Sequence, residues 1–125
     1  MKYACVYDSE QTMAGLIHHL CVTPVHLEYK RGPVPFVITG SQTPLVIEIE
    51  EVTRFYKDDP VVKKKTEDTR RDACEYVVLP WRRAIPKLLR FVVENGSTLF
   101  SHAWHRDLVF LSRTQEFIGG KHNRI

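Results

Sequence analysis

Cysteine is scarce in this chain. Three residues, Cys5, Cys21 and Cys74, lie far apart among 125. No two of them have the spacing of a zinc knuckle, and an odd number cannot all pair, so we expect free, buried thiols. This pattern excludes the disulfide framework of a small secreted domain and gives no zinc motif.

Long apolar runs are also missing. No stretch approaches the length that spans a bilayer, and Met1-Lys2 leads directly into a short apolar segment. The longer apolar region and cleavage site of a signal peptide are absent from this beginning. We therefore expect a soluble intracellular protein, cytoplasmic or nuclear, without a membrane partner.

Neither sign of charge is in large excess. The chain has 18 Lys and Arg residues against 15 Asp and Glu residues, a formal net charge of +3. So mild an excess permits a polyanionic partner without requiring one. With 43% hydrophobic and 26% charged residues, the composition predicts one globular domain over residues 1–125, with a core of modest size.

Two carboxylates follow an apolar segment at the beginning of the chain. Residues 3–8 have the β-branched and aromatic character of a strand with both faces covered, and Asp8 and Glu10 stand at its end. Because they are two residues apart on an extended segment, their side chains point to the same side and can share a cation.

A third carboxylate follows another strand-like segment. Residues 98–101 are predicted as a short central strand, and Asp107 stands where the chain opens into an apolar helix. If the two strands lie side by side in parallel, Asp8, Glu10 and Asp107 converge. Three carboxylates so close would repel one another unless a divalent metal ion neutralised them, so the pattern predicts a site for phosphoryl transfer.

Both segments resemble motifs of the DEDD family of 3′-5′ exonucleases, which have a ribonuclease-H-like fold. Asp8, Glu10 and Thr12 match the first motif, and His102 and Asp107 have the separation of the second. The resemblance implies that Asp8, Glu10 and Asp107 are the catalytic metal ligands. It also implies two bound ions, Mg²⁺ or Mn²⁺, and the 3′ end of single-stranded DNA or RNA as substrate.

Other residues take their expected roles from these motifs. Thr12, and Trp104 beside Asp107, would contact the nucleic acid, although a tryptophan such as Trp104 is more often a core or rim residue than a base-stacking one. The family's third motif, a His or Tyr followed by a fourth carboxylate, has no counterpart before Ile125. The fold would then be C-terminally incomplete, and a further domain or partner chain would complete it.

The residues between the two motifs predict the rest of an α/β fold. Alternating apolar residues indicate three strands that form an antiparallel meander after the first strand, at residues 25–29, 34–39 and 45–52. Residues 13–20 fit one or two helical turns. His18 and His19 fall within them, and we expect a solvated surface pair because no ligand stands at metal-binding spacing.

Two helices complete the predicted fold. The first follows Pro80, ends at Asn95-Gly96, and leads by a right-handed crossover to the strand at residues 98–101, in parallel with the first strand. Its apolar face would consist of Ile85, Leu88, Leu89, Val92 and Val93. The final helix, headed by Asp107, would break at Gly119-Gly120 and leave residues 121–125 as a loose basic tail.

Residues 57–78 form a predicted charged insertion or loop. Acidic and basic residues interleave there, which is typical of a solvated helix or a mobile loop. The functional alternative is a rim that guides a phosphate backbone past the carboxylates without sequence preference. Its cations would be Lys63, Lys64, Lys65, Arg70 and Arg71.

Two classes of function remain open from the sequence. In the first, the chain is a metal-dependent 3′-5′ exonuclease domain, or a fragment of one, that hydrolyses phosphodiester bonds of DNA or RNA. In the second, it is a catalytically inactive, nuclease-derived module that acts by binding, as a structural component of a nucleic-acid-handling or viral assembly. The presence of all three carboxylates favours the first class, and the missing third motif favours the second.

Overall fold

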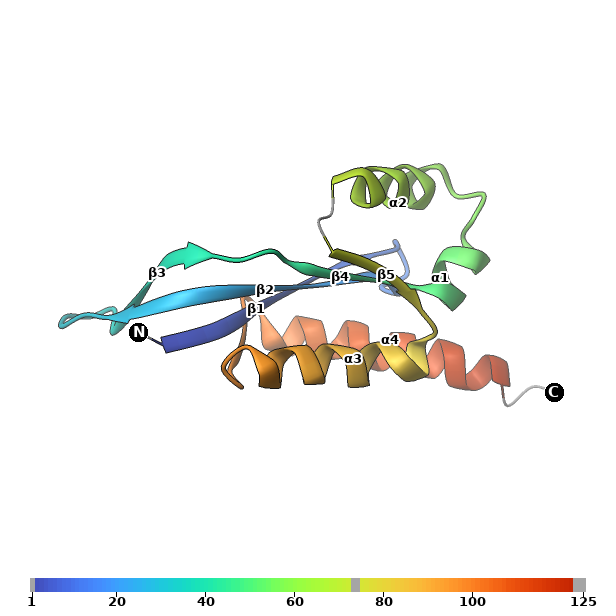
Figure 1. The fold of residues 1–125 in the computed structure, drawn as a ribbon. Helices are drawn as coiled ribbons and strands as arrows, with labels where there is room; N and C mark the ends of the chain where they lie inside the picture. The colour runs from blue at the N-terminus through green and yellow to red at the C-terminus, as the bar shows by residue number, and fades with distance from the viewer. Residues whose placement is uncertain (1, 73–74, 123–125) are drawn as a thin grey trace.

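The structure of the protein is a computed structural model, which describes residues 2–72 and 75–122 of the chain and, of residues 121 and 122, the backbone alone. Four strands come first along it, and the helices with the last two strands follow (Figure 1). In chain order they are β1 (Lys2–Gln11), β2 (Ile17–Tyr29), β3 (Phe36–Ser41), β4 (Leu45–Ile49), α1 (Glu50–Phe55), α2 (Pro60–Asp72), β5 (Glu75–Leu79), α3 (Trp81–Glu94), β6 (Leu99–Ser101) and α4 (Trp104–His122).

One mixed sheet organises the fold. In the described residues it has six strands, five of them in the order β5-β4-β2-β1-β6, while β3 pairs with the free part of β2 beside β4. The two outer pairs, β1 with β6 and β4 with β5, are parallel, and the pairs that involve β2 are antiparallel. The α/β class predicted from the sequence is confirmed, as is the parallel pairing of β1 with β6.

Strand β2 is much longer than the sequence pattern indicated. The predicted helical turns at residues 13–20 are wrong, because residues 13–15 form a tight turn and the strand begins at Ile17. Residues 19–22 pair with β1 on one side and with β4 on the other, so every backbone group there is held in a ladder. This tertiary pairing overrides the weak local preference for a helix.

The antiparallel meander is confirmed only in its first two hairpins. Strand β4 does not pair with β3 but returns to β2, opposite residues 19–22, while β3 pairs with residues 25–29 of the same strand. The strand expected at residues 45–52 ends at Ile49, where helix α1 begins. The long β2 strand and β3 thus form an arm that extends beyond the helices (Figure 1).

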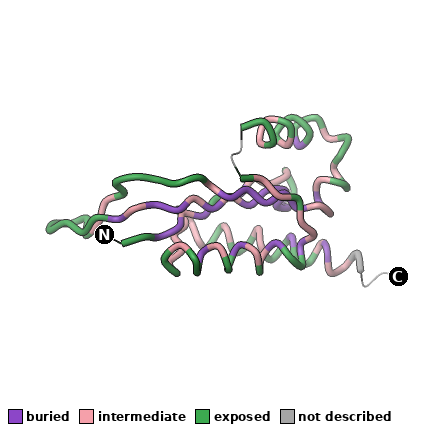
Figure 2. Tube along the Cα trace, viewed as in Figure 1, coloured by how far each residue is buried: buried purple, intermediate pink, exposed green. Residues whose placement is uncertain are grey.

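Helices cover the two faces of the sheet unequally. Helices α3 and α4 lie side by side along one face, and α2 stands over part of the other (Figure 1). The main core lies between the sheet and the α3–α4 layer, and its buried side chains concentrate in the centre of the sheet (Figure 2). Within the described part of the chain, no helix is long and apolar enough to cross a membrane.

Strand β6 lies at the edge of the sheet and not at its centre as predicted. Its three residues pair with β1 alone, and all three are half-buried. Helix α3 follows β5 at the opposite edge, so it crosses beneath the whole sheet before the chain reaches β6. The predicted strand, helix and strand order holds, but the strand before the helix is β5, which the sequence pattern did not reveal.

Helix α3 ends where the sequence predicted. It runs to Glu94, and Gly96 follows with a φ of +107°, a conformation that glycine adopts easily. Gly96 also lies against the backbone of β1, close to the Tyr3 carbonyl group.

The buried face of α3 differs from the predicted one, because Leu89 and Val93 are exposed. The buried residues of the helix are Trp81, Ala84, Leu88 and Val92.

Helix α4 continues through the glycine pair that was expected to end it. It extends to His122, and Gly119 and Gly120 lie within it. Each glycine costs a helix only about 1 kcal/mol relative to alanine, which packing of Ile118 and Phe117 against the core can offset. The predicted loose tail at residues 121–125 falls on residues 121 and 122, which are helical, and on residues 123–125, which lie outside the described residues.

The charged segment is a helix followed by a strand. Helix α2 has Val62 as its one buried side chain among those described, which agrees with the solvated-helix alternative. Strand β5 then begins at Glu75 and pairs in parallel with β4, so the end of the predicted insertion at residues 57–78 belongs to the sheet.

Candidate carboxylate site at the end of β1 and β6

A small hollow lies along the edge of β1, just beyond the carboxyl end of the parallel strand β6. Its volume is about 160 Å³, and Asp8 and Asp107 both line it. Strand β6 ends at Ser101, opposite Tyr7, so β6 leaves the edge of β1 uncovered from Asp8 onward. Ligands of open α/β sheets bind at this end of parallel strands, which makes the hollow the candidate site.

Asp107 reaches the hollow from the first turn of α4. Its carboxylate accepts a hydrogen bond from the Ser101 hydroxyl group, which fixes the side chain against the end of β6. The position near the positive end of the helix favours the ionised carboxylate. Asp107 therefore lies in the first turn of the helix that follows β6, near the position that the sequence predicted.

Asp8 reaches the same hollow from β1. The side chain is exposed, and its Oδ1 atom accepts a hydrogen bond of 2.8 Å from the Ser9 backbone N–H group. The other Oδ atom has no hydrogen bond within the described part of the protein. Asp8 and Asp107, 99 positions apart in the sequence, thus face one space.

Glu10 is directed elsewhere. Its Oε2 atom lies 2.5 Å from Nζ of Lys65 on α2, and both side chains are about half exposed. Glu10 does not line the hollow that Asp8 and Asp107 share. Across residues 2–72 and 75–122, no three His, Cys, Asp or Glu side chains are grouped closely enough to hold a metal ion.

Thr12 and Trp104 have structural contacts. The Thr12 hydroxyl accepts a hydrogen bond of 3.2 Å from the Leu16 N–H group and closes the turn between β1 and β2. Trp104 stacks on Tyr7, with ring centroids 5.5 Å apart, and packs against the main core. The Trp104 ring is therefore part of the core, which was one of its two expected roles. It also lies one helical turn from Asp107.

Most of the predicted basic rim is paired with carboxylates. Lys65 binds Glu10, and Arg71 binds Asp68 and Asp72. Arg70 extends toward the sheet, and its Nε and Nη2 groups donate hydrogen bonds of 3.1 and 3.0 Å to the Glu48 carboxylate. Among the described side chains, Lys63 and Lys64 make no ion pair, so they are the cations that α2 offers to a partner.

His18 and His19 are buried and not solvated as expected, with 1% and 2% of their surfaces exposed. A bulge explains this, because Glu10 pairs with His19 and Gln11 with Ile17, which leaves His18 as the extra residue of β2. The bulge turns His18 toward His19, and their Nδ1 atoms lie 2.6 Å apart.

The two histidines belong to a buried hydrogen-bond chain that reaches Glu48 on β4. His19 Nε2 lies 2.8 Å from the Tyr76 hydroxyl, which in turn donates to Glu48. The donors must therefore run in one direction: His18 Nδ1–H to His19, His19 Nε2–H to Tyr76, and Tyr76 to the carboxylate. Arg70 and Thr53 also donate hydrogen bonds to the Glu48 carboxylate.

Burial and neighbouring groups shift the pKa values of His18 and Glu48. Burial and the neighbouring His19 ring lower the pKa of His18 to about 4. Burial alone would raise the pKa of Glu48, but the nearby His19 ring, the hydrogen bond from Tyr76 and the charge of Arg70 outweigh it and lower that pKa to about 2. At neutral pH the network therefore contains a neutral His18 and an ionised Glu48.

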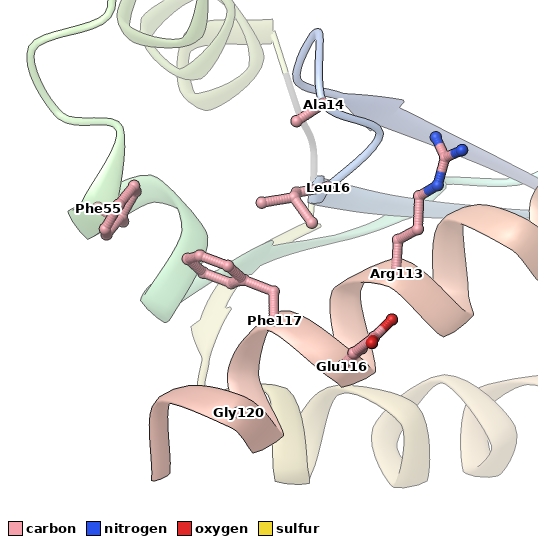
Figure 3. A pocket seen from close by; sticks show the side chains of 7 residues that line it. All are labelled: Ala14, Leu16, Phe55, Arg113, Glu116, Phe117 and Gly120. Atoms are coloured by element: carbon pink, nitrogen blue, oxygen red, sulfur yellow. The ribbon is translucent and has the colours of Figure 1, made fainter. Parts of the chain in front are cut away.

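A larger and more apolar hollow lies at the other end of α4. It measures about 600 Å³ between the β1–β2 turn, α1 and α4 (Figure 3). Phe55 and Phe117 meet edge to face at its wall, with ring centroids 5.2 Å apart, and Arg113 extends toward the turn that contains Gly15. Its lining supplies no pair of carboxylates, so it does not offer the chemistry that the sequence predicted.

Comparison with known proteins gives no relative. No family model matches the chain, and no curated protein or solved structure is significantly similar to it. The resemblance to 3′-5′ exonucleases therefore depends on the motif residues and on the positions in which the fold places them.

Proposed function

We propose that this chain is a metal-dependent 3′-5′ exonuclease domain, or part of one, that acts on single-stranded DNA or RNA. One observation carries the proposal: Asp8 on β1 and Asp107 on α4 line a single hollow at the carboxyl end of β6, where β6 leaves the edge of β1 uncovered. Neither a carboxylate pair nor a strand end is specific alone. Their combination, with the two motifs in this order, supports phosphoryl-transfer chemistry.

The residues of the hollow fit a hard divalent cation. Mg²⁺ is usually held by one or two carboxylates, with water and substrate phosphate oxygens as its other ligands, so Asp8 and Asp107 suffice as the protein's share. When bound there, such an ion would polarise the phosphodiester group and lower the pKa of a coordinated water molecule. Ser101 would keep the Asp107 carboxylate oriented, and Asp8 would present its free oxygen from the opposite wall.

The test is release of nucleotides from labelled single strands of DNA and RNA in the presence of Mn²⁺. We expect release by the full chain, and its loss in Asp8→Asn and in Asp107→Asn, because each change removes a negatively charged ligand while keeping the side-chain shape. Asp58→Asn is the matched control, since Asp58 is an exposed carboxylate outside the hollow. Activity that survives both substitutions in the hollow would contradict the proposal.

A second candidate function is binding of nucleic acid without hydrolysis. The observation that favours it is the ion pair between Glu10 and Lys65, in which a lysine occupies the carboxylate that the first motif would give to a metal ion. Under this alternative, the protein binds an oligonucleotide in the presence of a metal chelator and releases no nucleotide when Mn²⁺ is added.

Replacement of Lys65 by methionine tests whether Glu10 can act as a further metal ligand. Both partners of the pair are about half exposed, so we expect the free energy of unfolding to change by less than about 1 kcal/mol. If Glu10 serves as a metal ligand, its release should strengthen Mn²⁺ binding several-fold, measured by isothermal titration calorimetry. Lys64→Met, one position away on α2 and without an ion pair among the described side chains, is the control. Unchanged Mn²⁺ affinity in Lys65→Met would show that Glu10 is not a metal ligand and that the site depends on Asp8 and Asp107 alone.

A further inference from the structure

Among the described residues, the Tyr7 hydroxyl group makes no well-formed hydrogen bond, although the Ser9 side chain lies close to it. In the described part of the molecule it is the one buried side-chain polar atom in this condition. The residue is 4% exposed, and its ring is fixed by the stack with Trp104. Buried polar groups are nearly always paired, and a tyrosine that packs its ring in a core usually finds a partner for its hydroxyl group. An orphan at this position therefore indicates a partner that is not part of the chain.

Tyr7 is one of the residues that line the hollow of the two carboxylates, together with Ser9. A tyrosine keeps its proton at neutral pH, because the ordinary pKa of a phenol is about 10. The Tyr7 hydroxyl group is therefore a hydrogen-bond donor.

The neighbouring polar groups are already engaged with one another. Ser101 donates to Asp107 and accepts at 3.3 Å from the Ala103 N–H group. Ser9 Oγ accepts a hydrogen bond of 2.5 Å from Gln11, and Asp8 Oδ1 accepts from the Ser9 N–H group. These contacts leave the proton of the Tyr7 hydroxyl group, like that of the Ser9 hydroxyl group, without an acceptor among the described residues.

We propose that the Tyr7 hydroxyl donates a hydrogen bond to a phosphate oxygen of the nucleic-acid strand bound in the hollow, which makes Tyr7 a substrate-binding residue. This inference rests on the proposed function. A phosphodiester oxygen accepts hydrogen bonds but cannot donate them, so it matches a donor that lacks an acceptor. Arg106, which also lines the hollow, supplies a positive charge for the same anionic group.

Tyr7→Phe tests the inference with a single missing oxygen atom. The substitution keeps the ring that stacks on Trp104 and removes a hydroxyl that bonds to no described residue, so the midpoint of thermal unfolding should stay the same or rise. Binding of a short single-stranded oligonucleotide with a free 3′ hydroxyl, measured by calorimetry in Ca²⁺, should weaken about tenfold, as expected for the loss of a hydrogen bond to a charged group. Tyr3→Phe is the control, because Tyr3 is 41% exposed and lies outside the hollow.

Three other results would overturn the inference, and they separate it from the proposed function. If Tyr7→Phe binds the strand like wild type while Asp8→Asn does not, Tyr7 has no role and the carboxylate site stands. If Tyr7→Phe lowers the unfolding midpoint without weakening binding, the partner of the hydroxyl is an ordered water molecule. If wild type binds no strand, or binds it independently of Asp8 and Asp107, both the proposed function and the role of Tyr7 fail.

Discussion

Replacing Gly96 with alanine is expected to lower the free energy of unfolding by about 3 kcal/mol or more. Two costs combine at this position. A Cβ atom there would lie 2.3 Å from the Tyr3 carbonyl oxygen and 2.8 Å from its carbon, which is backbone and cannot turn aside. In addition, the φ of +107° is one that residues with a side chain rarely adopt.

The consequence of this change should extend to the carboxylate site. Gly96 joins α3 to the segment whose Thr98 carbonyl accepts a hydrogen bond of 2.8 Å from Cys5, and a shift of this turn moves β6 along the edge of β1. Chemical denaturation followed by circular dichroism measures the loss. Gly40→Ala is the matched control, since a Cβ atom at Gly40 would meet nothing within 4 Å. A loss below about 1 kcal/mol in Gly96→Ala would contradict the close approach of this turn to β1.

The second large effect is a loss of stability in mild acid, of about 3 kcal/mol between pH 7 and pH 4. His18 is the cause, because its pKa is lowered to about 4 in the folded protein from an ordinary value of 6.5. Between these two values the unfolded chain binds a proton that the folded protein does not. Stability is therefore greatest above pH 6.5, falls as the pH decreases toward 4, and levels off below it so far as His18 is concerned.

The surroundings of His18 disfavour the protonated form of its ring. The ring lies among His19 on its own strand, Glu10 on β1, Glu48 on β4 and Lys65 on α2, and burial is the dominant influence. Glu48 adds a second loss at lower pH, because its pKa of about 2 lies below the ordinary 4.5, so its contribution is present above pH 4.5 and disappears as the pH falls toward 2. The two losses occupy separate pH ranges.

Replacing His18 with glutamine tests whether His18 causes the loss of stability between pH 6.5 and pH 4. Denaturation of His18→Gln at a series of pH values should show little change between pH 6.5 and 4, although its stability at pH 7 is lower because the hydrogen bond to His19 is altered. His105→Gln, on the exposed surface of α4, should keep the acid loss of the wild type. If His18→Gln loses as much stability between pH 7 and pH 4 as wild type does, His18 is not the responsible group.

Strong local patterns predicted much of this fold. The apolar residues of β1, the turn at Gly96 and the helix after Pro80 were each specified by neighbouring residues, and the parallel pairing of β1 with β6 followed from their order. The beginning of β2 was missed because the bulge at His18 interrupts the two-residue period of a strand. Strand β5 was missed because a charged helix precedes it, and its place in the sheet depends on pairing with β4, which is distant in sequence.

The candidate site was predicted in part for the same reason. Asp8 lies on β1 and Asp107 on the helix that follows β6, so the pairing of the two strands brings both residues to one hollow. The direction of Glu10 depends on where α2 packs, and no pattern within the first strand contains that information. The environment of the Tyr7 hydroxyl group is visible only once its neighbours are in place. In the sequence, the buried hydrogen-bond network was indicated only by the adjacent residues His18 and His19 directly before an apolar run.

Both tryptophans lie on the same side of the sheet, Trp81 on α3 and Trp104 on α4, and both pack against the main core. Helix α2, on the opposite face, contains none. Intrinsic fluorescence of this protein therefore reports the α3–α4 layer and is blind to the release of α2, whereas the helical signal in the far ultraviolet records both events. A difference between the two signals during unfolding would isolate the detachment of the α2 helix and, with it, the exposure of the buried histidines.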